Sequence, residues 1–228
     1  MKEICKIIGF WAPENKKYCE EFSAGHEAVL IDHGFSHFKS NEDSWHESKD
    51  TFVFVAVVDD EVVGGIRLEK KVSGRLLSLE KAILPIDKRI IVLMDALKNR
   101  TVVESCGLWN SRKIAGRNIS QILTRLCTVV SPMISNDIVS FCFNATYTFR
   151  ITRSLGYSIV TSLGTDGYMN YPTPNYKAAL WMNDDLVDLE LADDFEKERI
   201  LSLRGNLTQE YNEPNKRGQI LIQYEINI

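Results

Sequence analysis

The chain has 228 residues, of which 44% are hydrophobic and 25% are charged, and its formal net charge is -4. This composition suits a packed core and argues against intrinsic disorder. The negative charge argues against a dedicated nucleic-acid binder.

The cysteines and the N-terminus bear on cellular location. The first apolar stretch is short and is interrupted by Lys6, so it does not resemble a signal peptide. No apolar run approaches the roughly 20 residues of a membrane span. Neither a disulfide framework nor a cysteine zinc site is indicated, because no CxxC pair occurs and the cysteines are odd in number and scattered: Cys5, Cys19, Cys106, Cys127 and Cys142. We expect a cytoplasmic protein with reduced thiols.

The first part of the chain reads as strand, helix, loop and hairpin. Residues 3–10 form an apolar strand pattern, and a helix is expected to open at Pro13 and end at Gly34. The polar and aromatic residues 35–50 predict a loop or a broken helix. The strongest hairpin signal is at 51–71, where two β-branched runs flank the turn Asp59-Asp60-Glu61.

The rest alternates strands and helices. The predicted strands are 102–109, 137–143, 157–164, 177–183 and 218–228, and the predicted helices are 119–130, 145–156 and a C-terminal one that ends at Gly205. From Asp184 onward the chain carries 11 acidic residues against 5 Lys or Arg. The last strand alternates apolar and polar residues, as a half-buried strand does.

Three cations surround one glycine where a predicted strand meets a predicted helix: Arg112, Lys113 and Arg117 around Gly116. A helix N-terminus attracts anions, and a glycine lets the backbone approach a ligand closely. The pattern indicates a phosphate site, although it is neither a P-loop nor a dinucleotide fingerprint. The alternative is a plain strand–helix connection with a solvated basic rim.

The order of elements resembles that of the acyl-CoA N-acyltransferases of the GNAT superfamily. Residues 113–118 are similar to the family's Q/R-x-x-G-x-G/A turn, with Lys113 and Asn118 replacing its first and last residues, and "FRITRSLGY" resembles its second signature. The resemblance implies an α/β (α+β) fold with a mixed, mostly antiparallel central sheet and helices on both faces. It also implies one acyltransferase-like domain over residues 1–228, with its core at about 52–183 and terminal additions.

The resemblance implies a donor site for acetyl-CoA or another acyl-CoA. Backbone groups near Leu108 and Trp109 would polarise the thioester carbonyl, and Asn144 would contact the pantetheine arm. The diphosphate would be bound by the turn, with Arg112, Lys113, Ala115, Gly116, Arg117 and Asn118. The alternative for Asn144 is a helix cap.

Two residues are candidates for proton transfer. Glu104 is a carboxylate inside an apolar strand, where burial raises a carboxylate's pKa toward that of a general base; the alternative is an edge position or an ion pair with Arg67. Tyr147 is the phenol nearest to the family's general acid, whose aligned position here is Thr152. Tyr147 is equally compatible with helix packing.

The sequence gives fewer signals for the site of the amine acceptor than for the donor site. All four histidines fall between His26 and His46, without an HExxH, so no metal is expected. In the family the matching region lines the acceptor site, which suggests His37 and Trp45 together with Arg67; loop packing is the alternative.

Residues Gly64-Gly65-Ile66-Arg67-Leu68 and Glu104 resemble the acyl-homoserine-lactone synthases and N-acyl amino acid synthases. Those synthases carry an arginine where this chain has Gly107. We therefore expect first an N-acyltransferase that moves an acyl group, acetyl by preference, from acyl-CoA to an amine by direct attack in a ternary complex. The second reading is such a synthase, with a longer acyl donor and an acyl carrier protein as a partner. The third is a non-catalytic module that binds coenzyme A or a protein. A homodimer is left open.

Overall fold

The computed structural model describes residues 4–35 and 43–228. The chain forms two compact units. The first unit comprises Met1–Arg67, Gly107–Leu126 and Leu201–Ile228, and the second comprises Leu68–Cys106 and Cys127–Ile200. The prediction of a single domain over residues 1–228 remains a prediction.

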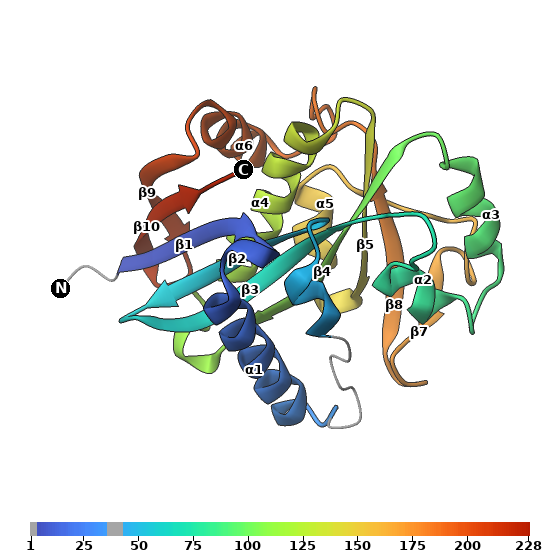
Figure 1. The fold of residues 1–228 in the computed structure, drawn as a ribbon, viewed down its shortest axis with the longest axis horizontal. Helices are drawn as coiled ribbons and strands as arrows, with labels where there is room; N and C mark the ends of the chain where they lie inside the picture. Colours follow the sequence, from blue (N-terminus) through green and yellow to red (C-terminus); the bar gives the residue numbers. More distant parts are fainter. Residues whose placement is uncertain (1–3, 36–42) are drawn as a thin grey trace. The chain divides into compact units, whose positions relative to one another are not determined.

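The first unit contains strands from both ends of the sequence (Figure 1). Its elements are β1 (Ile4–Trp11), η1 (Ala12–Glu14), α1 (Lys16–Asp32), η2 (Asp43–Glu47), β2 (Thr51–Val58), most of β3 (Glu61–Lys70), the end of β4 (Thr101–Asn110), η3 (Arg112–Ile114), the first half of α4 (Ile119–Ile134), the end of α6 (Asp194–Gly205), β9 (Thr208–Asn215) and β10 (Gly218–Ile226).

The strands of the first unit follow the order β9-β10-β1-β2-β3. The strand β1 is antiparallel to β2 and parallel to β10, with Ile7 opposite Tyr224. Alternate residues of β10 are buried, as the sequence pattern predicted. Helix α1 packs with Cys19 and Phe22 into an apolar cluster that also holds β2 residues such as Val55.

The second unit is built around the start of β4. Its other elements are α2 (Ser78–Ile83), α3 (Arg89–Ala96), the second half of α4, β5 (Ile138–Ala145), η4 (Thr146–Thr148), α5 (Phe149–Ser154), β6 (Ser158–Ile159), β7 (Tyr168–Asn170), β8 (Lys177–Asn183) and most of α6. β4 is parallel to β5, β5 is antiparallel to β8, and both β6 and β7 pair with β8. Side chains of α2, α3, β4, β5, β7 and β8 share one core cluster.

The chain is therefore a mixed α/β protein whose sheet has parallel and antiparallel strands flanked by helices, which confirms the predicted fold class. The hairpin prediction is confirmed, with Asp59 and Asp60 at φ 50° and 62° in its turn. The first long helix begins later than predicted. Pro13 lies in η1, and α1 begins at Lys16 because Asn15 Oδ1 accepts the Tyr18 N–H at 3.1 Å.

The sequence patterns missed α2, α3, β7 and β9. Within the described part of the chain, no helix is both long and apolar enough to cross a membrane.

Candidate active site

The basic turn has the backbone of an anion-binding loop. It leaves β4 where Ser111 N–H donates to Val63 O at 2.7 Å, and it passes through η3 before α4 begins at Ile119. Gly116 has a φ of 79° and Asn118 a φ of 60°, both in the left-handed region. The family pattern places glycine at the position of Gly116 and glycine or alanine at that of Asn118. Asparagine suits the latter position here because it adopts left-handed angles more readily than most residues.

Two of the three predicted cations of the turn face carboxylates. Lys113 Nζ forms an ion pair with Glu61 Oε2, and Arg112 Nη2 lies 3.5 Å from Asp32 Oδ2. All four side chains are more than half exposed, so these pairs contribute little to stability. Each cation could leave its carboxylate and form an ion pair with a ligand phosphate instead.

A hollow of about 310 Å³ adjoins the turn within the first unit. Residues of α1, of the β2–β3 hairpin and of the end of β4 line it, including Asp32, His33, Glu61, Trp109, Arg112 and Lys113. The lining of this hollow therefore carries charges of both signs.

Trp109 contributes its side chain to the core. The indole is 4% exposed and stacks edge-on against Phe22 at a centroid distance of 6.0 Å. A Cβ on Gly25 would overlap this ring, so α1 can pack here only with a glycine. Any contribution of Trp109 to a donor site would come from its backbone, and the same source was predicted for Leu108.

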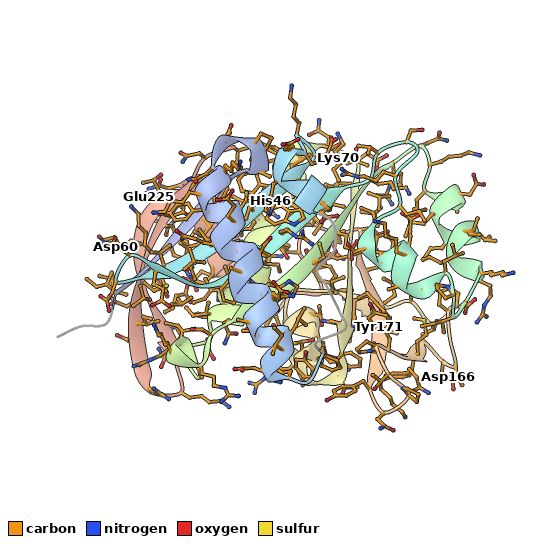
Figure 2. All side chains as sticks on the ribbon, turned by 60° about the horizontal axis from the view of Figure 1, so that its bottom comes forward. His46, Asp60, Lys70, Asp166, Tyr171 and Glu225 are labelled. Carbon is orange, nitrogen blue, oxygen red and sulfur yellow. The ribbon has the colours of Figure 1, made fainter. Side chains whose placement is uncertain are left out.

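Two of the three predicted acceptor residues lie together. The Arg67 guanidinium, in a residue only 9% exposed, lies 4.5 Å from the centroid of the Trp45 ring and 5.8 Å from that of Phe22. The third, His37, lies outside the described residues. Nearby, His46 Nε2 lies 2.9 Å from Ser23 Oγ on α1. Figure 2 labels His46 among the side chains of the structure.

This arginine cluster explains two further features. Burial, and then the charge of Arg67, lower the pKa of His26 to about 4. Gly107 has a φ of 63°, and a Cβ there would lie 3.3 Å from Arg67 Nε. The arginine that the synthases carry at this position would meet backbone strain and a like charge.

Glu104 is 3% exposed in the second unit. Its Oε2 accepts the backbone N–H of Leu79, in the first turn of α2, at 3.0 Å. Val102, two residues before it on β4, belongs to the core cluster shared with α2, so Glu104 points to that same face. The carboxylate is thus oriented by the backbone of an element that the sequence patterns missed.

Asn144, at the end of β5, offers an acceptor. Its Nδ2 donates to Thr152 Oγ1 at 3.4 Å, while its buried Oδ1 has no hydrogen-bond partner among the described residues. An amide N–H of a ligand would satisfy this oxygen. Thr152 is 1% exposed, and its hydroxyl is directed at the carbonyl groups of Thr148 and Phe149.

The phenols differ in setting. Tyr147 is 81% exposed. Tyr171, which the sequence analysis did not single out, packs on Phe143 at a centroid distance of 5.1 Å. Burial, and then the negative charge of Glu104, raise the pKa of Tyr171. Tyr171 lies between β7 and β8, and no sequence pattern marked this position.

The cysteines are all free thiols. Burial raises the pKa of Cys127, like that of Cys19, to about 12. Cys106 is partly exposed, in contrast to the other four. No group of three His, Cys, Asp or Glu residues is arranged to hold a metal ion in the part of the chain that the structure describes.

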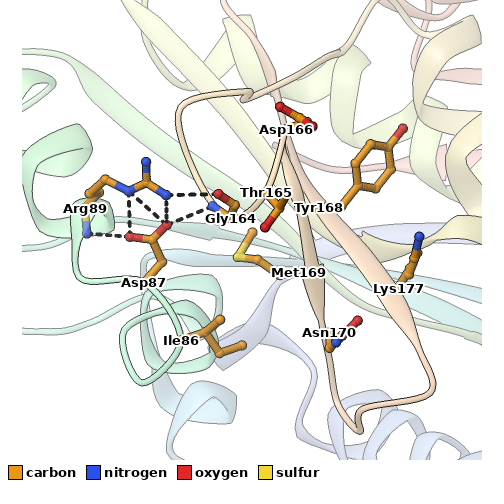
Figure 3. A pocket seen from close by; sticks show the side chains of 10 residues that line it. All are labelled: Ile86, Asp87, Arg89, Gly164, Thr165, Asp166, Tyr168, Met169, Asn170 and Lys177. Carbon is orange, nitrogen blue, oxygen red and sulfur yellow. Dashed lines mark hydrogen bonds and ion pairs between the residues drawn. The ribbon is translucent and has the colours of Figure 1, made fainter.

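A larger hollow, of about 740 Å³, lies in the second unit, and none of the predicted site residues lines it. Figure 3 shows the clamp at its side: Asp87 accepts hydrogen bonds from Arg89 and from Gly164 N, and Arg89 donates to Gly164 O. The Arg89 guanidinium, and then the Gly164 N–H, hold the pKa of Asp87 below its usual range. The clamp ties the loop before β7 to the start of α3.

No protein-family description matches the sequence, and no curated protein matches it. The fold does match solved structures. FeeM, an N-acyl amino acid synthase from uncultured soil microbes, has a TM-score of 0.55 at 13% identity, over 85% of this chain and 97% of FeeM. ElaA from Escherichia coli has a TM-score of 0.56 at 11% identity, over 78% and 98% of the two chains.

BjaI, a CoA-dependent acyl-homoserine lactone synthase whose structure contains SAM and isopentyl-CoA, has a TM-score of 0.51 at 12% identity, over 88% of this chain and 90% of that one. At sequence identities this low, the structural likeness shows a shared fold. The chain has the GNAT fold of acyl-CoA N-acyltransferases, as the resemblance in sequence predicted.

Proposed function

We propose that the protein is an N-acyltransferase that moves an acyl group from acyl-CoA, acetyl by preference, to an amine. The observation that carries this proposal is the turn at residues 112–118, where Gly116 and Asn118 have left-handed φ angles directly before α4. Backbone N–H groups of such a turn suit a diphosphate. Arg112, Lys113, Ala115 and Arg117 complete the proposed donor site.

The remaining roles follow the chemistry of acyl transfer. An amine arrives as an ammonium ion, so Glu104 accepts its proton directly or through water. The backbone near Leu108 and Trp109 polarises the thioester carbonyl. Asn144 Oδ1 accepts an N–H of the pantetheine arm, and Arg67 with Trp45 and His37 contributes to the acceptor side.

The proton for the departing thiolate has two candidate donors. Tyr147 has the position that the resemblance suggests, and Tyr171 lies where the negative charge of Glu104 acts on it. The pKa of each phenol is raised, so each is protonated at neutral pH. The metal-free chemistry proposed here needs no further cofactor.

The second candidate is an N-acyl amino acid or acyl-homoserine-lactone synthase with a longer acyl donor on coenzyme A or an acyl carrier protein. The Arg67 cluster and Glu104 favour it, since the sequence around both resembles that branch. The third candidate is a non-catalytic coenzyme A-binding module. The ion pairs of Arg112 with Asp32 and of Lys113 with Glu61 favour it, because they reduce the positive charge of the turn. A cytoplasmic location and a homodimer are proposed with the first reading.

The test combines binding and turnover. Acetyl-CoA or coenzyme A should raise the melting temperature, because a ligand of the native state stabilises it. Thiol release from acetyl-CoA with a panel of amines distinguishes the enzyme from the binding module, and release from long-chain acyl-CoA distinguishes the synthase. No thermal shift at millimolar ligand would contradict the first reading and the coenzyme A-dependent forms of the other two.

A further inference from the structure

The C-terminal hairpin of β9 and β10 reaches the basic turn within the first unit. Asn118 Nδ2 donates to Pro214 O at 3.0 Å, and a Cβ placed on Gly116 would lie 3.5 Å from Arg217 Nε. The tip of the hairpin, residues 214–217, therefore lies against both left-handed positions of the turn, although about 100 residues separate them in sequence.

A buried cluster holds the hairpin in this place. Glu213 Oε1 accepts hydrogen bonds from Arg125 Nη1 and from Tyr224 OH, each at 2.7 Å. The side chains of Arg125 and Glu213 are only 1% and 2% exposed. Because Arg125 belongs to α4, which begins directly after the turn, the hairpin is joined to the same helix that orients the turn. A buried pair of this kind is costly to break.

The charge at the tip is opposite to that of the segment that carries it. From Asp184 onward acidic residues outnumber basic ones by 11 to 5, yet Lys216 and Arg217 stand side by side at the tip. Within the described residues, no side chain is within hydrogen-bond or ion-pair distance of the Arg217 guanidinium; its backbone N–H donates to Asn215 Oδ1 at 2.8 Å. Arg112 and Lys113, in contrast, face carboxylates.

We propose that Arg217 is a further binding residue for the diphosphate of acyl-CoA, supplied to the turn by the C-terminal hairpin. This inference rests on the proposed function. A guanidinium beside the glycine backbone can donate two parallel hydrogen bonds to one phosphate, while the turn itself donates backbone N–H groups. The acidic C-terminal segment thus contributes a cation to the donor site.

Calorimetric titration of coenzyme A tests the proposal. Arg217→Ala should weaken binding by roughly tenfold at about 50 mM salt, as loss of one charge-assisted contact does, and by less at about 500 mM salt. Arg217→Lys should recover only part of the affinity because lysine lacks the planar fork. Lys216→Ala is the matched control: it removes the same charge from the same exposed tip, and it should weaken binding by less than Arg217→Ala.

Dephospho-coenzyme A identifies the phosphate concerned. Arg217→Ala should weaken it by the same factor as coenzyme A, since both ligands keep the diphosphate. A loss confined to coenzyme A would assign Arg217 to the 3′-phosphate and overturn the proposal. Equal losses in Arg217→Ala and Lys216→Ala, or wild-type affinity in Arg217→Ala, would also overturn it. If the wild-type chain binds neither ligand, the proposed function itself fails.

Discussion

The backbone N–H of Leu79 donates to Oε2 of Glu104 at 3.0 Å, so one oxygen of this buried carboxylate is fixed by the first turn of α2. The contact orients the side chain, whose carboxylate is the proton acceptor of the proposed mechanism. It also makes a conservative substitution informative, since a glutamine oxygen can accept the same N–H.

Glu104→Gln should therefore keep the fold and the affinity for coenzyme A, and it should lower turnover by roughly 10²–10⁴-fold. The measurement is thiol release from acetyl-CoA at saturating amine. Glu80→Gln is the control, because Glu80 is also buried and its Oε2 also accepts a backbone N–H, that of Leu77, at 2.8 Å. This substitution also weakens the ion pair of Glu80 with Lys71, so it should lower the melting temperature and preserve turnover. Turnover that is unchanged in Glu104→Gln between pH 6 and 9 would make Glu104 a structural residue.

The two candidate phenols can be separated by a pair of matched substitutions. If Tyr171 protonates the thiolate, Tyr171→Phe should lower turnover by on the order of 10²-fold, whereas Tyr147→Phe should leave it nearly unchanged. Tyr147 is 81% exposed, while Tyr171 is packed on Phe143. Single-turnover rates followed against pH provide the readout. The opposite ranking would return the role to Tyr147, and equal wild-type rates would assign the proton to water.

The sequence predicted local features and missed distant ones, for physical reasons. The turn at Gly116 and the hairpin at Asp59 and Asp60 depend on residues close in sequence, so spacing and composition reveal them. The position of Arg217 beside that turn depends on contacts between segments far apart in sequence: Glu213 with Arg125, and β10 with β1 in parallel. No local pattern encodes such a pairing.

The same distinction applies to the candidate site. Glu104 could be singled out as a lone carboxylate in an apolar strand, whereas its partner Leu79 lies in a short helix without clear periodicity. Likewise the sequence identified Trp45 and Arg67 separately, but only the folded chain shows the indole under the guanidinium.

His26 predicts how stability depends on pH. Its pKa is lowered to about 4 in the folded chain, so the unfolded chain binds a proton first as the pH falls below about 6.5. The free energy of unfolding contributed by His26 is complete above that value and is lost progressively down to about pH 4.

Urea titrations at several pH values measure this loss. His26→Gln should reduce the decline in stability between pH 6.5 and 4 by on the order of 1–3 kcal/mol. Identical pH profiles in wild type and His26→Gln would show that the burial of His26 and the charge of Arg67 do not determine this titration.

Gly116 provides the most direct test of the basic turn. At φ 79° a branched side chain is strained, and its Cβ would lie 3.5 Å from Arg217 Nε, where the diphosphate is proposed to bind. Gly116→Val should therefore abolish binding of coenzyme A and of dephospho-coenzyme A at any salt concentration, since steric exclusion is not screened. Gly74→Val is the matched control: Gly74 also has a φ of 79°, but nothing lies within 4 Å of its Cβ position, so this substitution should lower the melting temperature and preserve affinity. If folded Gly116→Val bound coenzyme A as tightly as the wild type, residues 112–118 would be a solvated connection between strand and helix.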